Sequence, residues 1–100
     1  MKLVLHPVFE KWLSDLRDRQ SRSRILTRLS HVQEGNFGDH KSVGDGVSEL
    51  RFAFGPGYRV YYTRRGNVVV IMLCGGDKGS QQSDIRKAKA LAAELEDGTW

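Results

Sequence analysis

Apolar residues recur with helical spacing in three stretches of this chain. In the first, which starts at Pro7, they stand three and four residues apart, typical of one face of an amphipathic helix: Phe9, Trp12, Leu13 and Leu16. In the second, which Ser21 or Ser23 could cap, the apolar residues are Ile25, Leu26, Leu29 and Val32. In the third, which Ser83 or Asp84 could cap, they are Ile85, Ala88, Leu91, Ala92 and Leu95. We therefore expect three helices, with the first two forming an antiparallel hairpin.

Between the second and third helical stretches the pattern changes to one that predicts strands. Val47 to Phe54 and Tyr58 to Arg64 alternate between apolar and polar residues. Val68 to Cys74 is apolar at nearly every position, typical of a strand that is covered on both faces. Turn residues separate or end these segments: Gly55-Pro56-Gly57, Arg65-Gly66-Asn67 and Gly75-Gly76-Asp77.

Two further segments complete the predicted architecture. Lys2 to Leu5 is a short apolar run that favours an edge strand, whereas residues 35–46 are rich in glycine, Asn and Asp and predict a loop. The order is then β-α-α-β-β-β-α, which indicates an α+β fold with a small antiparallel or mixed sheet. A chain of 100 residues suits one domain, residues 1–100.

The first predicted hairpin places several polar side chains on one face of the sheet. If residues 55–57 form a three-residue loop, Arg51 pairs with Tyr61, and alternate residues share a face. One face is then polar: Glu49, Arg51, Arg59, Tyr61 and Thr63. The other is apolar and packs on the helices: Leu50, Phe52, Phe54, Tyr58, Val60 and Tyr62. A shift of the pairing by two residues would preserve this division.

The charge of the chain points to an acidic partner. The net charge is +4 and the sequence pI is about 9.5, which favours nucleic acid as a ligand. Arginine fits phosphate oxygens, tyrosine can stack on a base, and Lys78 could reach the same edge of the sheet. The alternative, a solvated sheet face with Glu49 and Arg51 paired, remains open.

Other candidate chemistries are weaker. Cys74 is the one cysteine, which excludes an internal disulfide, and its apolar surroundings favour a small buried side chain. His6, His31 and His40 lack metal-ligand spacing, and Gly75 to Ser80 lacks the spacing of a phosphate-binding loop. We interpret the arginines of the second helix as a solvated face, with contact to ribosomal or other RNA as the alternative: Arg22, Arg24 and Arg28. No signal peptide or membrane span is evident, so we expect a cytoplasmic protein.

Several segments together resemble the RelE/ParE toxin superfamily. They are Gly35-Asn-Phe-Gly-Asp39, Val47-Ser-Glu-Leu-Arg51, Gly57-Tyr-Arg-Val-Tyr-Tyr62, and Gly75-Gly-Asp-Lys78 with Gln81. The resemblance covers nearly the whole chain and is strongest to the branch of addiction module killer proteins, which is related to HigB-type toxins. It implies a RelE-like fold and a type II toxin–antitoxin module. The implied partner is a cognate antitoxin of the helix-turn-helix type.

The resemblance also implies an activity and a set of residues. The activity is translation inhibition by ribosome-dependent cleavage of messenger RNA, without metal or cofactor, through attack of the ribose 2′-hydroxyl on the adjacent phosphate. Arg59 matches the catalytic strand arginine, Lys78 the basic residue after the central strand, and Arg51 a basic position on the preceding strand. The RNA-binding set adds Lys41 and Arg64.

The chain departs from the family at its C-terminal end. Members often carry a Tyr or His there as an acid or base, but this chain has neither after Tyr62 and ends Asp97-Gly-Thr-Trp100. Tyr61 is the substitute we consider for proton transfer. Two other functions remain open, because a shared fold does not fix function: a ParE-like, non-enzymatic inhibitor of DNA gyrase, and an inactive phage-derived homologue.

Overall fold

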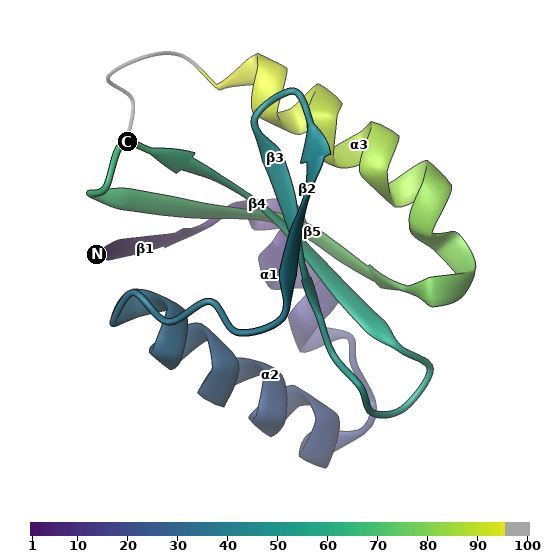
Figure 1. The fold of residues 1–100 in the computed structure, drawn as a ribbon. Helices are drawn as coiled ribbons and strands as arrows, with labels where there is room; N and C mark the ends of the chain where they lie inside the picture. The colour runs from purple at the N-terminus through teal and green to yellow at the C-terminus, as the bar shows by residue number, and fades with distance from the viewer. Residues whose placement is uncertain (96–100) are drawn as a thin grey trace.

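A computed structural model describes residues 1–95 and shows one five-stranded sheet between helices (Figure 1). Its elements in chain order are β1 (Lys2–Leu5), α1 (Pro7–Ser14), α2 (Arg19–Gln33), β2 (His40–Gly44), β3 (Val47–Arg51), β4 (Tyr58–Arg65), β5 (Val69–Asp77), the short 3-10 helix η1 (Lys78–Ser80) and α3 (Gln81–Glu94). The strand order is β1-β5-β4-β3-β2, with β1 parallel to β5 and the other pairs antiparallel. The predicted α+β class and mixed sheet are confirmed.

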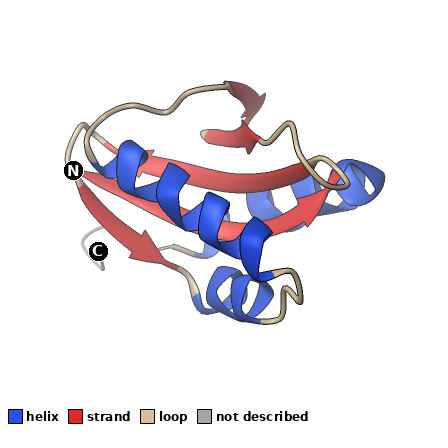
Figure 2. Ribbon diagram, turned by 90° about the horizontal axis from the view of Figure 1, so that it is seen from below, coloured by secondary structure: helices blue, strands red, loops and turns tan. Residues whose placement is uncertain are grey.

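The sheet separates two apolar clusters, and both of its faces are covered. Figure 2 shows α2 on one side of the strands and α3 on the other. The cluster on the α1 and α2 side contains Phe9, Leu13, Ile25, Leu29, Val32, Phe37, Leu50, Phe52, Val60, Tyr62, Val70 and Met72. The cluster on the α3 side contains Val47, Tyr61, Val69, Ile71, Leu73, Cys74 and Ala88. β5 supplies residues to both clusters, as its continuous apolar run predicted.

The helices start at caps that differ in part from those expected. Pro7 opens α1, and His6 Nδ1 accepts the Val8 N–H at 3.1 Å. Asp18 caps α2 by accepting from the Gln20 N–H at 3.0 Å and the Ser21 hydroxyl at 2.9 Å, so the predicted serine caps were wrong. These hydrogen bonds, that of Ser21 first, lower the pKa of Asp18. The predicted cap of the last helix was wrong too, because α3 follows η1 directly.

The segment expected to be a loop contains a strand. β2 pairs with β3 from His40 opposite Leu50 to Gly44 opposite Val47, with an irregularity between Ser42 and Gly44. The prediction failed because the strand is short, mostly exposed and flanked by glycines, so it lacks apolar alternation. β2 is a strand because its backbone pairs with β3, and its own sequence does not show the alternation of a strand.

Two strand boundaries and the hairpin register also differ from the predictions. Arg51 pairs with Arg59, and Glu49 with Tyr61, a shift of two residues that preserves the sorting of side chains. β3 ends at Arg51, so the connection to β4 is longer than three residues. β5 continues to Asp77 through Gly75 and Gly76. A Cβ at either position would collide with a neighbouring side chain, that of Trp12 at Gly75 and that of Asp84 at Gly76.

Candidate functional site

Arg59 and Lys78 line one hollow at the end of the sheet. The hollow has a volume of about 420 Å³, and its walls are formed by the β3–β4 connection: Phe52, Ala53, Gly55, Pro56 and Gly57. Arg59 is the second residue of β4, and Lys78 is the first residue of η1, which follows β5. The structure therefore brings together two cations that are 19 positions apart in the sequence.

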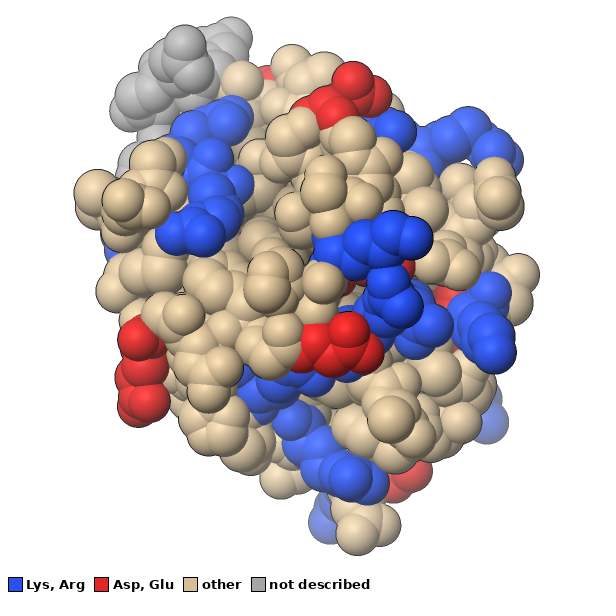
Figure 3. Space-filling view, viewed as in Figure 1, with Lys and Arg blue, Asp and Glu red and all other residues tan. Residues whose placement is uncertain are grey.

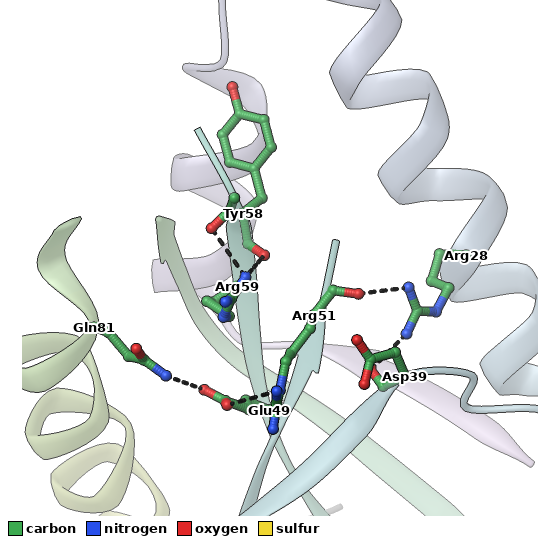
Figure 4. Close-up of polar contacts among 8 residues, drawn as sticks. Arg28, Asp39, Glu49, Arg51, Tyr58, Arg59 and Gln81 are labelled. Carbon is green, nitrogen blue, oxygen red and sulfur yellow. Dashed lines mark hydrogen bonds and ion pairs between the residues drawn. The ribbon is translucent and has the colours of Figure 1, made fainter. Parts of the chain in front are cut away.

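Arg59 is held in place by the backbone of the connection. Its Nη1 donates to the carbonyl oxygen of Gly57 at 3.2 Å and to that of Tyr58 at 3.1 Å (Figure 4), while its Nε is buried without a partner. Gly57 has a φ of +78°, and a Cβ there would lie 3.3 Å from Lys78 Cβ and 3.7 Å from Arg59 Nη1. Glycine at 57 therefore allows both the turn and the close approach of the two cations.

Lys78 is positioned by a capping box at the end of β5. Asp77 Oδ1 accepts the Gly79 N–H at 2.8 Å, and the Ser80 hydroxyl accepts the Asp77 N–H at 3.4 Å. The Lys78 side chain remains exposed. The spacing of an acidic residue and a serine three positions later was the signal for this box, and the sequence analysis missed it.

Arg51 lies beside Arg59 because the two residues pair directly across β3 and β4. Arg51 Nε lies 3.3 Å from Glu49 Oε1, close enough for an ion pair but without hydrogen-bond geometry. Gln81 Nε2 donates to the other oxygen, Glu49 Oε2, at 3.0 Å. Figure 4 shows this line from α3 through Glu49 to Arg51, whose side chain is 36% exposed. A buried carboxylate thus orients a partly exposed guanidinium.

The expectation of an open polar sheet face is wrong for three of its members. Glu49, Tyr61 and Thr63 are only 2%, 0% and 4% exposed because α3 covers this face. The Tyr61 hydroxyl is buried with no hydrogen-bond partner, and burial raises the pKa of Tyr61, with Glu49 adding to the effect. Tyr61 is therefore out of reach of an RNA strand at the hollow, and we remove it from the candidate set.

Lys41 and Arg64 lie in different places. Lys41 is exposed on β2, directly opposite Glu49, so it shares the face and the neighbourhood of Arg51. Arg64 lies toward the far end of β4, and its guanidinium carbon is 4.8 Å from the ring centre of Phe37, on the α2 side of the sheet. The structure does not bring Arg64 together with Arg59 and Lys78.

Arg28 is a structural residue that the sequence analysis treated as solvated. Its guanidinium is half-buried and donates to the carbonyl oxygens of Arg51 at 2.9 Å and Asp39 at 2.7 Å (Figure 4). It also donates to the carbonyl oxygen of Phe37 at 3.0 Å. Burial lowers the pKa of Arg28. No local pattern in the sequence indicates these acceptors, because they lie 9 to 23 residues away.

The cysteine and histidine candidates do not form a catalytic group. Within residues 1–95, no group of three or more His, Cys, Asp or Glu side chains could hold a metal ion. Cys74 is 1% exposed, as its apolar surroundings predicted, and burial raises its pKa to about 12. His40 is exposed at the start of β2, where its Nδ1 lies 2.8 Å from the carbonyl oxygen of Gly38. None of the helices described by the structure is long and apolar enough to cross a membrane.

Basic side chains are prominent on the face of the molecule that Figure 3 shows. In Figure 3, Lys and Arg form a broken band across the middle and lower part of the view, over the β2–β3 region and α2, with an acidic group between them. Such a surface attracts a polyanion, because the fields of neighbouring cations add.

Comparison with known proteins identifies the family. A family model described as phage derived protein Gp49-like (DUF891) matches residues 11–95. The chain belongs to the Gp49-like family. A Haemophilus influenzae (strain ATCC 51907 / DSM 11121 / KW20 / Rd) protein, described as an uncharacterized protein, is 52% identical to this Gp49-like chain over 87 residues, or 87% of the chain and 88% of the relative.

A solved structure shares the fold of this Gp49-like protein. It is a mutant of the E. coli toxin RelE in the free state, with a TM-score of 0.71 and 21% sequence identity. The similarity covers 94% of this chain and 97% of the RelE chain. The RelE-like fold that the sequence resemblance implied is therefore confirmed.

Proposed function

We propose that this Gp49-like protein is the toxin of a type II toxin–antitoxin module and cuts messenger RNA on the ribosome, in the manner of the HigB-like branch. The observation that carries the proposal is the placement of Arg59 and Lys78 around one hollow, with Arg51 on the adjacent strand. The N–H groups of a guanidinium donate to phosphate oxygens, and an ammonium adds a point charge. The RelE-like fold and the Gp49-like family support the same interpretation.

The proposed reaction needs charge stabilisation more than it needs a cofactor. The ribose 2′-hydroxyl loses its proton to solvent as its oxygen attacks the adjacent phosphorus. The bond to the 5′-oxygen breaks and that oxygen takes up a proton from solvent, which leaves a 2′,3′-cyclic phosphate and a 5′-hydroxyl end. Negative charge grows on the phosphate oxygens during the attack, and preorganised cations stabilise it. Arg59 is suited to this role because two backbone carbonyls hold its Nη1 in place.

The candidate residues include no strong base for proton transfer, which favours a reaction that depends on the ribosome. Tyr61 is buried, and the three residues that remain, Arg51, Arg59 and Lys78, are cations. A site that lacks a strong base gains most when another body aligns the 2′-oxygen with the scissile bond. We therefore expect free RNA to be cut far more slowly than messenger RNA held in a ribosome.

The test is to map transcript 5′ ends after brief induced expression in bacteria. The native chain is expected to create new ends inside translated codons. Arg59→Ala should reduce them about a hundredfold, the usual effect of losing one preorganised charge donor. Arg86→Ala is the matched control, because Arg86 is an exposed arginine on α3 outside the candidate set. Growth arrest without new RNA ends would contradict the nuclease proposal, and a gyrase supercoiling assay would then test the ParE-like alternative.

The proposed partner is a cognate antitoxin that masks the basic face. The net charge of +4 makes capture by an acidic segment favourable, chiefly through faster association. Co-expression with the small gene adjacent to the toxin gene should restore growth. Toxicity that persists when that gene product is present and bound would contradict this partner.

A further inference from the structure

A second hollow adjoins the one that holds Arg59 and Lys78. It has a volume of about 410 Å³ and lies between α2 and the start of the β3–β4 connection. Phe52 and Ala53 line both hollows, so the two share a wall. A ligand that extends from the first hollow over this wall would enter the second.

The second hollow is lined by aromatic and basic side chains. Phe52 and Phe54 come from the β3–β4 connection, and Arg24, Arg28 and His31 come from α2. Within residues 1–95, no acidic side chain lines either hollow. The Asp39 carboxylate affects Arg28 by its charge, so Arg24 is the cation whose charge is less compensated.

Arg24 forms a flat platform that is open on one side. Its guanidinium carbon lies 4.1 Å from the ring centre of Phe54, so one face of the guanidinium stacks on the ring. The side chain is exposed and makes no ion pair among the residues that the structure describes. Arg28 also lies over a ring, that of Phe52 at 4.8 Å, but three carbonyl oxygens occupy four of its five N–H donors. Arg24 donates no hydrogen bond to the residues that the structure describes, so it has more donors free for a ligand.

We propose that this α2 groove is a nucleobase subsite, in which a base of the RNA strand stacks on Arg24 while a neighbouring phosphate lies between Arg59 and Lys78. The inference rests on the proposed function and extends it from the phosphate to an adjacent nucleotide. Unpaired RNA bases commonly stack on aromatic rings or on guanidinium planes, and such stacking tolerates any base. The groove therefore fixes the position of the strand without reading its sequence.

The charge pattern favours RNA over a protein segment. A strand that passes from the first hollow to the second meets Lys78 and Arg59 at a phosphate, and at a base it meets the plane of Arg24, which lies over the Phe54 ring. An alternating polyanion with flat apolar bases matches both features. An amphipathic acidic peptide matches the positive charge and the aromatic side chains, but it gains nothing from a planar guanidinium. The variant Arg24→Lys therefore distinguishes RNA from such a peptide.

The test uses a fluorescent single-stranded RNA octamer with 2′-O-methyl riboses, which cannot undergo attack by the 2′-oxygen. Its affinity is measured by anisotropy for the native chain, for Arg24→Lys and for the control Arg86→Lys. Arg24→Lys retains the charge but removes the plane, and it should weaken binding about fivefold or more. Arg86→Lys should bind within about twofold of the native chain, because a single charge is retained.

A scan with abasic octamers then locates the stacked base. When the missing base is the one that occupies the groove, the difference between the native chain and Arg24→Lys should disappear. Equal affinities of native and Arg24→Lys chains for the intact octamer would overturn the subsite, while the Arg59→Ala mapping could still support the nuclease. Failure of the native chain to bind the octamer, with an acidic amphipathic peptide binding instead, would assign the groove to a protein partner.

Discussion

The side chain of Gln81 reaches from the first turn of α3 to the buried carboxylate of Glu49, with 3.0 Å between Nε2 and Oε2. The other oxygen of Glu49 lies 3.3 Å from Arg51 Nε. The helix that covers one face of the sheet is therefore linked to a guanidinium at the edge of the candidate site. This link gives α3 a role in orienting Arg51 as well as in burying apolar surface.

Replacing Gln81 with Leu should destabilise the protein. The variant removes one donor from a carboxylate that is 2% exposed, and an unsatisfied buried acceptor costs about 1–2 kcal/mol. Gln82→Leu is the matched control, because Gln82 is the exposed neighbour on the same helix and should change stability by less than about 0.5 kcal/mol. Urea unfolding of the three chains measures both effects. Equal midpoints for the two variants would show that the link carries no stability.

Arg28→Lys should reduce the free energy of unfolding by about 2 kcal/mol, because an ammonium cannot replace a fork that donates to three separate carbonyls. Arg24→Lys, one turn earlier on α2, is exposed and should be neutral within about 0.5 kcal/mol. Thermal or urea unfolding compares the two. A neutral Arg28→Lys would mean that water replaces the carbonyl contacts without loss.

Gly75→Ala should destabilise the chain by about 1–3 kcal/mol, because the new methyl group would collide with the Trp12 ring. The backbone of Gly75 is not in the left-handed region, so the collision is the main cause. In a Trp12→Ala background the same substitution should be much less harmful. A double-mutant cycle in urea measures this coupling, and additive losses would rule out the ring as the cause.

The stability of the protein should fall at alkaline pH partly because of Cys74. Burial, with Asp84 adding to it, raises the pKa of the folded thiol from 9.0 to about 12. The unfolded chain therefore loses this proton first, so stability is highest below pH 9.0 and declines as the pH rises toward 12. Between pH 8.5 and 10 the native chain should lose about 1 kcal/mol more than Cys74→Ala does. Parallel pH profiles of the two chains would contradict the assignment.

Hydrophobic periodicity predicted the helices and strands that have one apolar face. It did not predict features that depend on a second element, such as which helix covers a face of the sheet. The residues of β3 and β4 alternate correctly, so the sharing of a face by Glu49, Arg51 and Arg59 was predictable even with a register error of two residues. Alternation cannot say what covers that face. The apolar residues of the last helix required a surface to pack on, and the polar face of the sheet was the one left.

The candidate site was predictable in its strand residues and less so in its supports. The alternating pattern placed Arg59 on the polar face with Lys78 near its edge, and the family resemblance implied a catalytic role for both. The structure brings them to one hollow. Arg28 and Gln81 were missed as supports because their acceptors lie 23 and 32 residues away in the sequence. Hydrogen bonds of that range leave no periodic signal in the chain.

The pairing of β1 with β5 also fixes when the protein can finish folding during synthesis. Lys2–Leu5 is the first strand to be made, yet its partner residues are Val69–Met72. Gln81, which holds the Glu49 carboxylate, is made later still. Domains fold as units, so the growing chain has no completed sheet before Met72 is made and no oriented Arg51 before Gln81 is made. Under the proposed activity on translating ribosomes, this order would keep the unfinished chain harmless to the ribosome that makes it.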